Sequence, residues 1–144
     1  MEKYKIFYAL FVLLGMSLSF TACSDDDDEV SSSQLVGTWE ATWEKGYEKW
    51  EDEIDEWDEA PEEPFRITFY EDGTWLSEYY YNGKWHDEEN GTYSVKGNKI
   101  YVSDRWDDYE VTIVSITSSQ FILEEKGKDA DEEWYYKTTY KRVK

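Results

Sequence analysis

The feature that most constrains the fold is a series of short alternating segments separated by glycine-containing turn signals. After Pro64 the turn signals are Asp72-Gly73, Asn82-Gly83, Asn90-Gly91 and Gly97-Asn98. Between them apolar and polar side chains alternate, which is the period of a strand with one buried face. Such dipeptides favour the tight turns of β-hairpins. The pattern predicts about eight antiparallel strands that pair in chain order, as a closed barrel or a sandwich.

The first strand is expected to precede this series. Residues 35–44 alternate between apolar and polar side chains. In a strand, Trp39, Ala41 and Trp43 would therefore lie together on the buried face. The last strand is expected to end near Val143. Pairing of the first strand with the last would remove the exposed edges that invite aggregation.

Residues 47–63 change period and predict an acidic helical insertion between the first two strands. The apolar residues here are spaced by three or four positions, which favours an amphipathic helix. They are Tyr47, Trp50, Ile54 and Trp57. Pro61 and Pro64 would end the helix. Two roles stay open for it, a lid over one mouth of a barrel or a cover for exposed apolar edges, and the second is the simpler.

The N-terminal segment is typical of a secretory signal sequence. Lys3 and Lys5 precede an apolar, uncharged stretch at residues 6–20, and small residues follow it. A membrane-spanning helix needs about 20 apolar residues, whereas this stretch is shorter and is soon followed by four aspartates. We therefore expect residues 1–22 to be a cleaved signal peptide.

Thr21-Ala22-Cys23 resembles the lipobox of bacterial lipoproteins, in which a small residue precedes a cysteine that is acylated and becomes the new N-terminus. Phe20 stands where that family usually has leucine. Cys23 is the only cysteine of the chain, so no intramolecular disulfide can form. The resemblance implies a lipoprotein held at the membrane by acyl chains such as palmitate on Cys23. Several such chains anchor stably, because each buried methylene adds about 0.8 kcal/mol.

The acidic run at residues 24–29 resembles the export signal that follows the lipid cysteine in surface-exposed lipoproteins of some Gram-negative bacteria. That resemblance implies an outer-membrane protein that faces outward. Like charges also keep such a run extended. Residues 23–33 are therefore expected to tether a barrel domain at residues 34–144. The run lacks the glycine turn and later glutamate of a calcium loop, so no metal site is predicted.

Charge and residue usage exclude several classes of function. A net charge of −19 repels phosphate backbones, so nucleic acid is not an expected partner. His86 is the only histidine, which leaves no ligand set for zinc, and no serine stands in a nucleophile-elbow context. The P-loop and dinucleotide glycine motifs are absent. We predict a protein that is not an enzyme and has no cofactor, with a hydrolase that uses paired carboxylates as the weaker alternative.

Four short motifs occur in order along the expected domain. They are Leu35-Val36-Gly37-Thr38-Trp39, Phe69-Tyr70-Glu71-Asp72-Gly73-Thr74, Gly91-Thr92-Tyr93-Ser94-Val95 and Tyr140-Lys141-Arg142. Together they resemble lipocalins, and more closely the small lipocalin-like domains of bacterial lipoproteins. The resemblance implies an eight-stranded antiparallel meander barrel with an internal cavity. It also implies that Arg142 packs on Trp39 and closes the barrel, a contact of roughly 0.5–2 kcal/mol.

The same resemblance implies a small apolar or amphipathic ligand inside the barrel. The candidate ligand-binding residues, in the interior or the lid, are Trp43, Trp50, Trp57, Phe69, Trp75 and Tyr93. Aromatic residues make up 19% of the chain. An eight-stranded barrel is just wide enough to hold side chains or one small ligand, so a filled barrel with a structural role stays open.

The aromatic excess also supports an alternative, a glycan- or protein-binding module on the cell surface. Trp85, Trp106 and the run Tyr79-Tyr80-Tyr81 would stack against sugar rings if they were exposed. Strands favour aromatic residues in any case, and ordinary packing is the simpler explanation.

Overall fold

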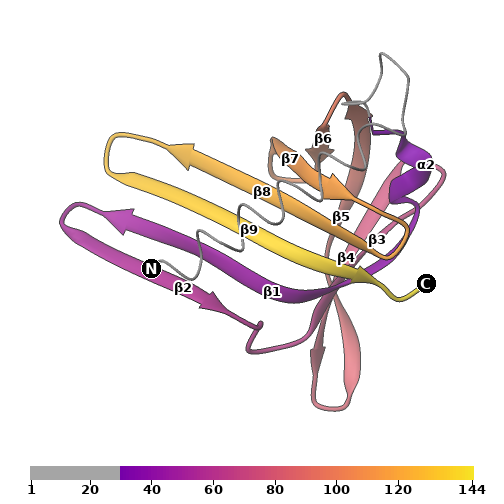
Figure 1. Cartoon of the computed structure of the whole chain (residues 1–144), viewed down its shortest axis with the longest axis horizontal. Coiled ribbons are helices and arrows are strands. Elements are labelled where there is room, and N and C mark those ends of the chain that lie inside the picture. The colour runs from indigo at the N-terminus through magenta and orange to yellow at the C-terminus, as the bar shows by residue number, and fades with distance from the viewer. Residues whose placement is uncertain (1–29) are drawn as a thin grey trace, which may run out of the picture.

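Nine antiparallel strands within residues 30–144 form one continuous sheet in this computed structural model, preceded by one short helix (Figure 1). The elements are α2 (Ser32–Leu35), β1 (Gly37–Trp50), β2 (Glu53–Glu59), β3 (Phe65–Phe69), β4 (Thr74–Tyr81), β5 (Lys84–Lys96), β6 (Lys99–Ser103), β7 (Asp108–Ile116), β8 (Gln120–Lys128) and β9 (Glu132–Arg142). The predicted signal peptide, Cys23 and the acidic run lie outside the described residues. Within those residues, no helix has the length and apolar character that a membrane crossing requires.

Eight of these strands close into a barrel. Strands β3 to β9 pair in chain order, and β9 then pairs with β1. The other edge of β1 pairs with β3 at its first residues, from Gly37↔Phe69 to Glu40↔Arg66. The predicted eight-stranded antiparallel meander barrel is therefore confirmed, with β2 as an additional strand beside the second half of β1.

Three of the four predicted glycine turns are found between strands. At Asn82-Gly83 both residues have positive φ angles, 54° and 84°, as a two-residue type I′ hairpin requires. The fourth prediction is wrong, because Asn90-Gly91 lies inside β5. A Cβ atom at Gly91 would collide with the backbone carbonyl of Ser103. Gly91 therefore allows the backbones of β5 and β6 to approach each other closely, and it does not form a turn.

Gly37 begins β1 in a conformation that other residues avoid. Its φ is +136°, and a Cβ atom there would lie 2.6 Å from the carbonyl oxygen of Lys144. The next residue, Thr38, donates its N–H to that same carbonyl at 3.1 Å. The glycine of the Gly37-Thr38-Trp39 motif is thus explained by backbone geometry where the C-terminus crosses the first strand.

The predicted helix at residues 47–63 is wrong, because the segment forms a β-hairpin. β1 continues to Trp50, and β2 pairs back along it from Trp50↔Glu53 to Glu44↔Glu59. On its other edge β1 pairs with β9 as far as Trp50↔Glu132. Backbone hydrogen bonds from two neighbouring strands therefore override the helical spacing of the apolar residues, which is a weak local preference.

The hairpins β1–β2 and β8–β9 reach beyond the barrel on the same side and lie next to each other (Figure 1). We call this four-stranded region, β2 with the paired ends of β1, β9 and β8, the extension. Side chains alternate between its two faces. One face continues the barrel interior and carries Trp57, Tyr136 and Glu125, which share a row with Gly46 across the four strands.

A β-bulge in β1 changes which residues face inward. Ala41 pairs with Tyr140 but Trp43 pairs with Thr139, so Thr42 is the extra residue on β1. One inserted residue reverses the side-chain order beyond it. The prediction that Trp43 shares the buried face of Trp39 and Ala41 is therefore wrong, since Trp43 points outward with 47% of its surface exposed.

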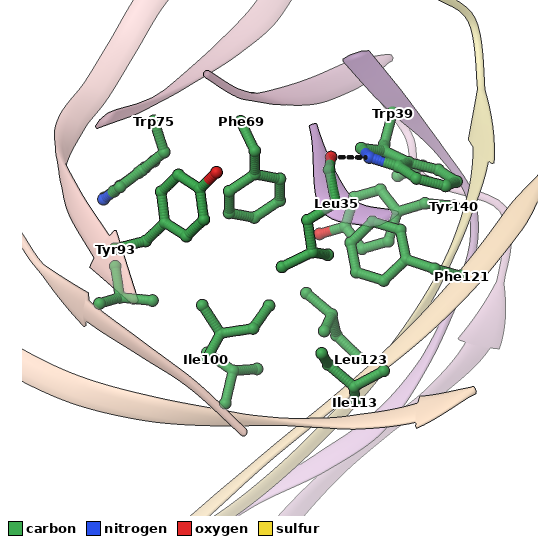
Figure 2. Packing of buried hydrophobic residues seen from close by; sticks show 13 residues of the cluster. Leu35, Trp39, Phe69, Trp75, Tyr93, Ile100, Ile113, Phe121, Leu123 and Tyr140 are labelled. Atoms are coloured by element: carbon green, nitrogen blue, oxygen red, sulfur yellow. Dashed lines mark hydrogen bonds between the residues drawn. The ribbon is translucent and has the colours of Figure 1, made fainter. Parts of the chain in front are cut away.

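The core fills one end of the barrel and is built largely from rings (Figure 2). Its buried members are Leu35, Trp39, Ala41, Phe69, Trp75, Tyr93, Ile100, Val102, Val111, Ile113, Phe121, Leu123 and Tyr140. The segment predicted as polar tether contributes here, because Ser31 and Gln34 form a capping box that starts α2. α2 places Leu35 fully inside, where its carbonyl accepts the indole N–H of Trp39 at 2.8 Å.

Candidate functional site

A partly open hollow of about 140 Å³ lies inside the barrel, and we call it the interior cavity. Its wall combines apolar residues of the core with polar groups at one end. The lining residues are Ile67, Phe69, Trp75, Ile100, Val102, Tyr109, Val111, Leu123, Glu125, Tyr136, Thr138 and Tyr140. An apolar protein cavity of about 150 Å³ is large enough to hold benzene. The interior cavity therefore suits a molecule, or part of one, about the size of a single ring.

A second hollow, of about 290 Å³, joins the polar end of the interior cavity, and we call it the side pocket. The two hollows share Glu125, Tyr136 and Thr138 in their walls. Glu44 and Trp57 complete the inner face of the side pocket. The two hollows therefore lie next to each other, one among core side chains and the other over the extension.

Glycine positions the aromatic ring that borders the side pocket. The ring of Trp57 lies over Gly46, where a Cβ atom would approach Cζ2 of the indole to 2.8 Å. Trp57 then stacks on Tyr136, with ring centroids 5.5 Å apart and planes at 28°. The hydroxyl of Tyr136 donates to Glu48. These contacts hold two aromatic faces beside the carboxylates of the site.

Two carboxylates lie where the two hollows meet, which we call the mouth. Both are partly removed from water. Burial raises the pKa of Glu125 above its ordinary value. Burial, followed by the charge of Glu59, raises the pKa of Glu44. Within the described residues, neither carboxylate has a hydrogen bond or ion pair with another side chain. The protein therefore keeps two incompletely compensated negative charges at the junction of the hollows.

Tyrosines around the cavity experience the same negative field. Burial and then nearby acidic groups, Glu89 first and Glu125 second, raise the pKa of Tyr109 to about 12. Burial and then Glu44 raise the pKa of Tyr140, and Glu125 adds to that effect. These phenols stay protonated at neutral pH and present O–H groups at the wall.

We expect Glu125→Gln to raise the thermal stability of the protein at pH 7. A folded-state pKa above the unfolded value means that the native chain holds this proton more tightly, so stability from the group falls as pH rises through the raised pKa. Glutamine removes the desolvated charge. The gain should disappear below about pH 4, where the carboxyl is protonated in both states.

Circular dichroism melting curves at pH 7 and pH 4 test this expectation. Glu62→Gln is the matched control, because Glu62 is exposed in the link between β2 and β3 and loses the same unit of charge. A lower melting temperature for Glu125→Gln at pH 7 would instead show that the carboxylate makes a stabilising contact.

Three of the predicted ligand-binding residues lie at the core. Phe69 and Trp75 line the interior cavity. Tyr93 is buried and packs edge-on against Phe69 at 4.9 Å, while its hydroxyl donates to the carbonyl of Tyr70 at 2.8 Å. Figure 2 shows Trp75, Tyr93 and Phe69 grouped on one side of the core. Tyr93 thus supports the wall behind Phe69.

The other three predicted ligand-binding residues lie on the extension, where no lid helix exists. Trp57 borders the side pocket. Trp43 faces outward and donates its indole N–H to Asp58 at 2.8 Å. Trp50 ends β1 at the hairpin tip and is exposed. The structure therefore removes Trp43 and Trp50 from the interior and leaves Trp57 at its mouth.

Trp39 and Arg142 lie at the closed end of the barrel, away from the mouth. The guanidinium carbon of Arg142 is 4.1 Å from the centre of the Trp39 ring. Its three nitrogens donate to the carbonyls of Ser118, Val36 and Gln34 at 2.7, 2.7 and 2.8 Å. This arginine therefore links β9 to the segment before β1 and to the β7–β8 turn.

The aromatic residues predicted for the alternative, a surface binding site for glycans, do not form a flat platform. Tyr80 and Trp85 meet at an interplanar angle of 66° and make no flat platform. Trp106 is 76% exposed in the turn between β6 and β7, beneath the guanidinium of Arg105. His86 is half-buried and stacks on Tyr79. Among residues 30–144, no group of three or more histidine, cysteine or acidic side chains is arranged to hold a metal ion.

Sequence reasoning missed the polar residues of the mouth. Glu44 lies on the expected solvent face of the first strand, and only the bulge at Thr42 turns it inward. Glu125 and Tyr136 face each other across β8 and β9, but acidic residues are so frequent in this chain that neither position stood out. The single available signal was alternation along β9, which places Tyr136 on the same face as Tyr140.

Comparison with known proteins relates this architecture to one family. A family model described as a lipocalin-like domain matches residues 35–123. No curated protein matches the sequence. The crystal structure of a lipocalin-like protein from Bacteroides uniformis gives a TM-score of 0.50 at 16% identity, covering 76% of this chain and 99% of that chain. This likeness concerns the fold alone.

Two further solved structures are similar. An uncharacterized protein from Bacteroides eggerthii has a TM-score of 0.49 at 13% identity, covering 76% of this chain and 99% of that chain. A bovine odorant-binding protein in complex with a selenium-containing odorant has a TM-score of 0.47 at 15% identity, covering 81% of this chain and 74% of that chain.

Proposed function

Because this chain belongs to the family of lipocalin-like domains, we propose that it binds a small apolar or amphipathic molecule in the interior cavity and is held at the membrane by lipid on Cys23. Members of this family are generally binding proteins rather than enzymes, and the fold typically takes small hydrophobic ligands. The observation that carries the proposal is the partly open, mainly apolar cavity within the barrel.

The size of the cavity supports a small ligand. Pockets for drug-sized molecules are about 300–1,000 Å³, whereas the interior cavity holds about 140 Å³. The side pocket supplies further room for a polar or charged part. A molecule with one apolar ring and one polar end therefore fits better than a long-chain lipid.

We expect Thr138→Phe to abolish binding of a neutral aromatic probe such as benzyl alcohol. Thr138 borders both hollows, so a larger ring at this position would fill the junction. Titration calorimetry on the full chain in a non-ionic detergent measures the affinity, with detergent alone as the blank.

Thr139→Phe is the matched control, because Thr139 is the next residue of β9 and lies on the opposite face. It should leave the affinity for benzyl alcohol unchanged. If the wild-type protein binds neither benzyl alcohol nor a charged molecule with the same ring, the ligand-binding proposal fails. Native mass spectrometry of the protein from its own host would then test for a bound molecule of another kind.

The proposed anchor rests on the lipobox-like residues before Cys23 and on the acidic run after it. Cys23→Ala is expected to move the protein from the membrane fraction to the soluble fraction, because the acyl chains are its proposed membrane contact. Ser24→Ala is the control and should stay with membranes. A Cys23→Ala protein that still partitions with membranes would contradict the anchor.

The proposed location is the outer face of the outer membrane in a Gram-negative bacterium. This proposal depends on the acidic run at residues 24–29, which resembles a surface-export signal. When these acidic residues are replaced by alanine, the protein should keep the lipid on Cys23. It should no longer be cleaved by protease added to intact cells. Unchanged cleavage in that variant would contradict the assigned role of the run.

A further inference from the structure

We propose that the junction of the interior cavity and the side pocket selects an organic cation, with its ammonium group between Glu44 and Glu125 and its apolar ring in the interior cavity. This inference rests on the proposed ligand-binding function and names its ligand class. It starts from the position of the two carboxylates relative to β9. Glu44 pairs with Thr138 from one side of that strand, and Glu125 pairs with Tyr136 from the other.

The register places these groups on one face. Thr138 and Tyr136 are two residues apart on β9 and therefore point the same way, into the barrel and its extension. Their strand partners Glu44 and Glu125 point with them. Both hollows include Glu125 in their walls, and the side pocket includes Glu44 as well. The acidic groups thus stand where a ligand passes from the interior cavity to the side pocket.

The protein does not neutralise these charges itself. Lys45 and Lys137 border the side pocket, but alternation along β1 and β9 sends their side chains to the opposite face. The ammonium of Lys45 lies 3.1 Å from Asp58 on that face. Among the described residues, Glu44 and Glu125 have no basic partner. A bound cation would supply the compensation that partly desolvated carboxylates lack.

The electrostatic potential inside the barrel is also negative. Burial comes first among the causes that raise the pKa of Tyr136, Tyr140 and Tyr109, and the carboxylate of Glu125 contributes at all three. No lysine or arginine is among the causes at any of them. The negative potential therefore extends from the mouth to the cavity wall, which favours a cation over a neutral or anionic molecule of equal size.

Aromatic faces at the mouth suit an alkylated ammonium group. Trp57 and Tyr136 stack beside the carboxylates, and the electron-rich faces of such rings attract quaternary ammonium groups.

Three probes that share a benzyl group test the inference with the full chain in a non-ionic detergent. They are benzyltrimethylammonium, benzyl alcohol and phenylacetate, which share a single ring and differ in charge. We expect benzyltrimethylammonium to bind about tenfold or more tightly than benzyl alcohol, with phenylacetate the weakest. Titration calorimetry measures all three affinities.

Glu44→Gln and Glu125→Gln should each weaken binding of the cation about tenfold more than they change binding of benzyl alcohol. Glu62→Gln removes the same unit of charge at an exposed position far from the hollows and should change neither affinity. Circular dichroism confirms folding of each variant before titration.

The outcomes separate this inference from the proposed function. Equal binding of the cation and benzyl alcohol would overturn the cation preference and leave the binding function standing. Equal loss of cation affinity in Glu62→Gln and Glu125→Gln would also overturn it, because attraction by net charge would then suffice. Binding of none of the three probes would overturn both.

Discussion

Phe121→Ala is expected to destabilise the domain by about 3–5 kcal/mol, the usual cost of removing a large buried ring. Phe121 is fully buried and lies beside Tyr140 and Trp39 in Figure 2. It lies edge-on to Trp39 at 4.7 Å and stacks on Tyr140 at 4.8 Å. The truncation leaves a void between β1, β8 and β9, where the barrel closes.

Urea unfolding followed by tryptophan fluorescence measures this loss. Ile122→Ala is the matched control, because Ile122 is the next residue of β8, faces outward and is half-buried. We expect the control to cost less than about 1.5 kcal/mol. A loss for Phe121→Ala no larger than that of the control would show that the closed end repacks around the void.

Arg142→Ala is expected to cost about 2–4 kcal/mol, because several carbonyl groups lose a charged donor and one indole loses its cation. The guanidinium bridges Ser118, Val36 and Gln34 and covers Trp39. Removing it should loosen α2 and the C-terminal residues from the end of the barrel. Arg142→Lys should restore only part of the lost stability. An ammonium group keeps the positive charge but lacks the planar fork of the guanidinium.

A second arginine of the same chain provides the control. Arg105 lies 4.9 Å above the ring of Trp106, but both residues are exposed in the β6–β7 turn. Arg105→Ala should change the unfolding free energy by less than about 0.5 kcal/mol. Equal effects of Arg105→Ala and Arg142→Ala would mean that the carbonyl bridges at the closed end do not stabilise the fold.

Most of the barrel could be predicted because its information is local. Alternation identified the strands, and three Gly-containing dipeptides identified turns that the structure contains. Asn90-Gly91 was misassigned because the need for glycine there comes from the backbone of β6, which no local pattern reveals. The helix prediction at residues 47–63 failed for a related reason, since pairing with β9 holds that segment extended.

The site was less predictable than the fold. Phe69 and Trp75 were expected in the interior from the resemblance to lipocalins, and they do line the cavity. The bulge at Thr42 explains both the wrong placement of Trp43 and the omission of Glu44. It turns Trp43 outward and Glu44 inward. Glu125 gave no signal because its environment depends on β9 and on the hollows beside it.

The sequence by itself determined the meander, because alternation and turn chemistry are local properties, and the resemblance of its motifs to lipocalins implied the contact between Trp39 and Arg142. Only the tertiary structure decided the long hairpins of the extension, the bulge and the acidic mouth. These depend on the register between β1 and β9, which joins residues about 100 positions apart. A shift of one residue in that register decides whether a tryptophan or a glutamate faces the cavity.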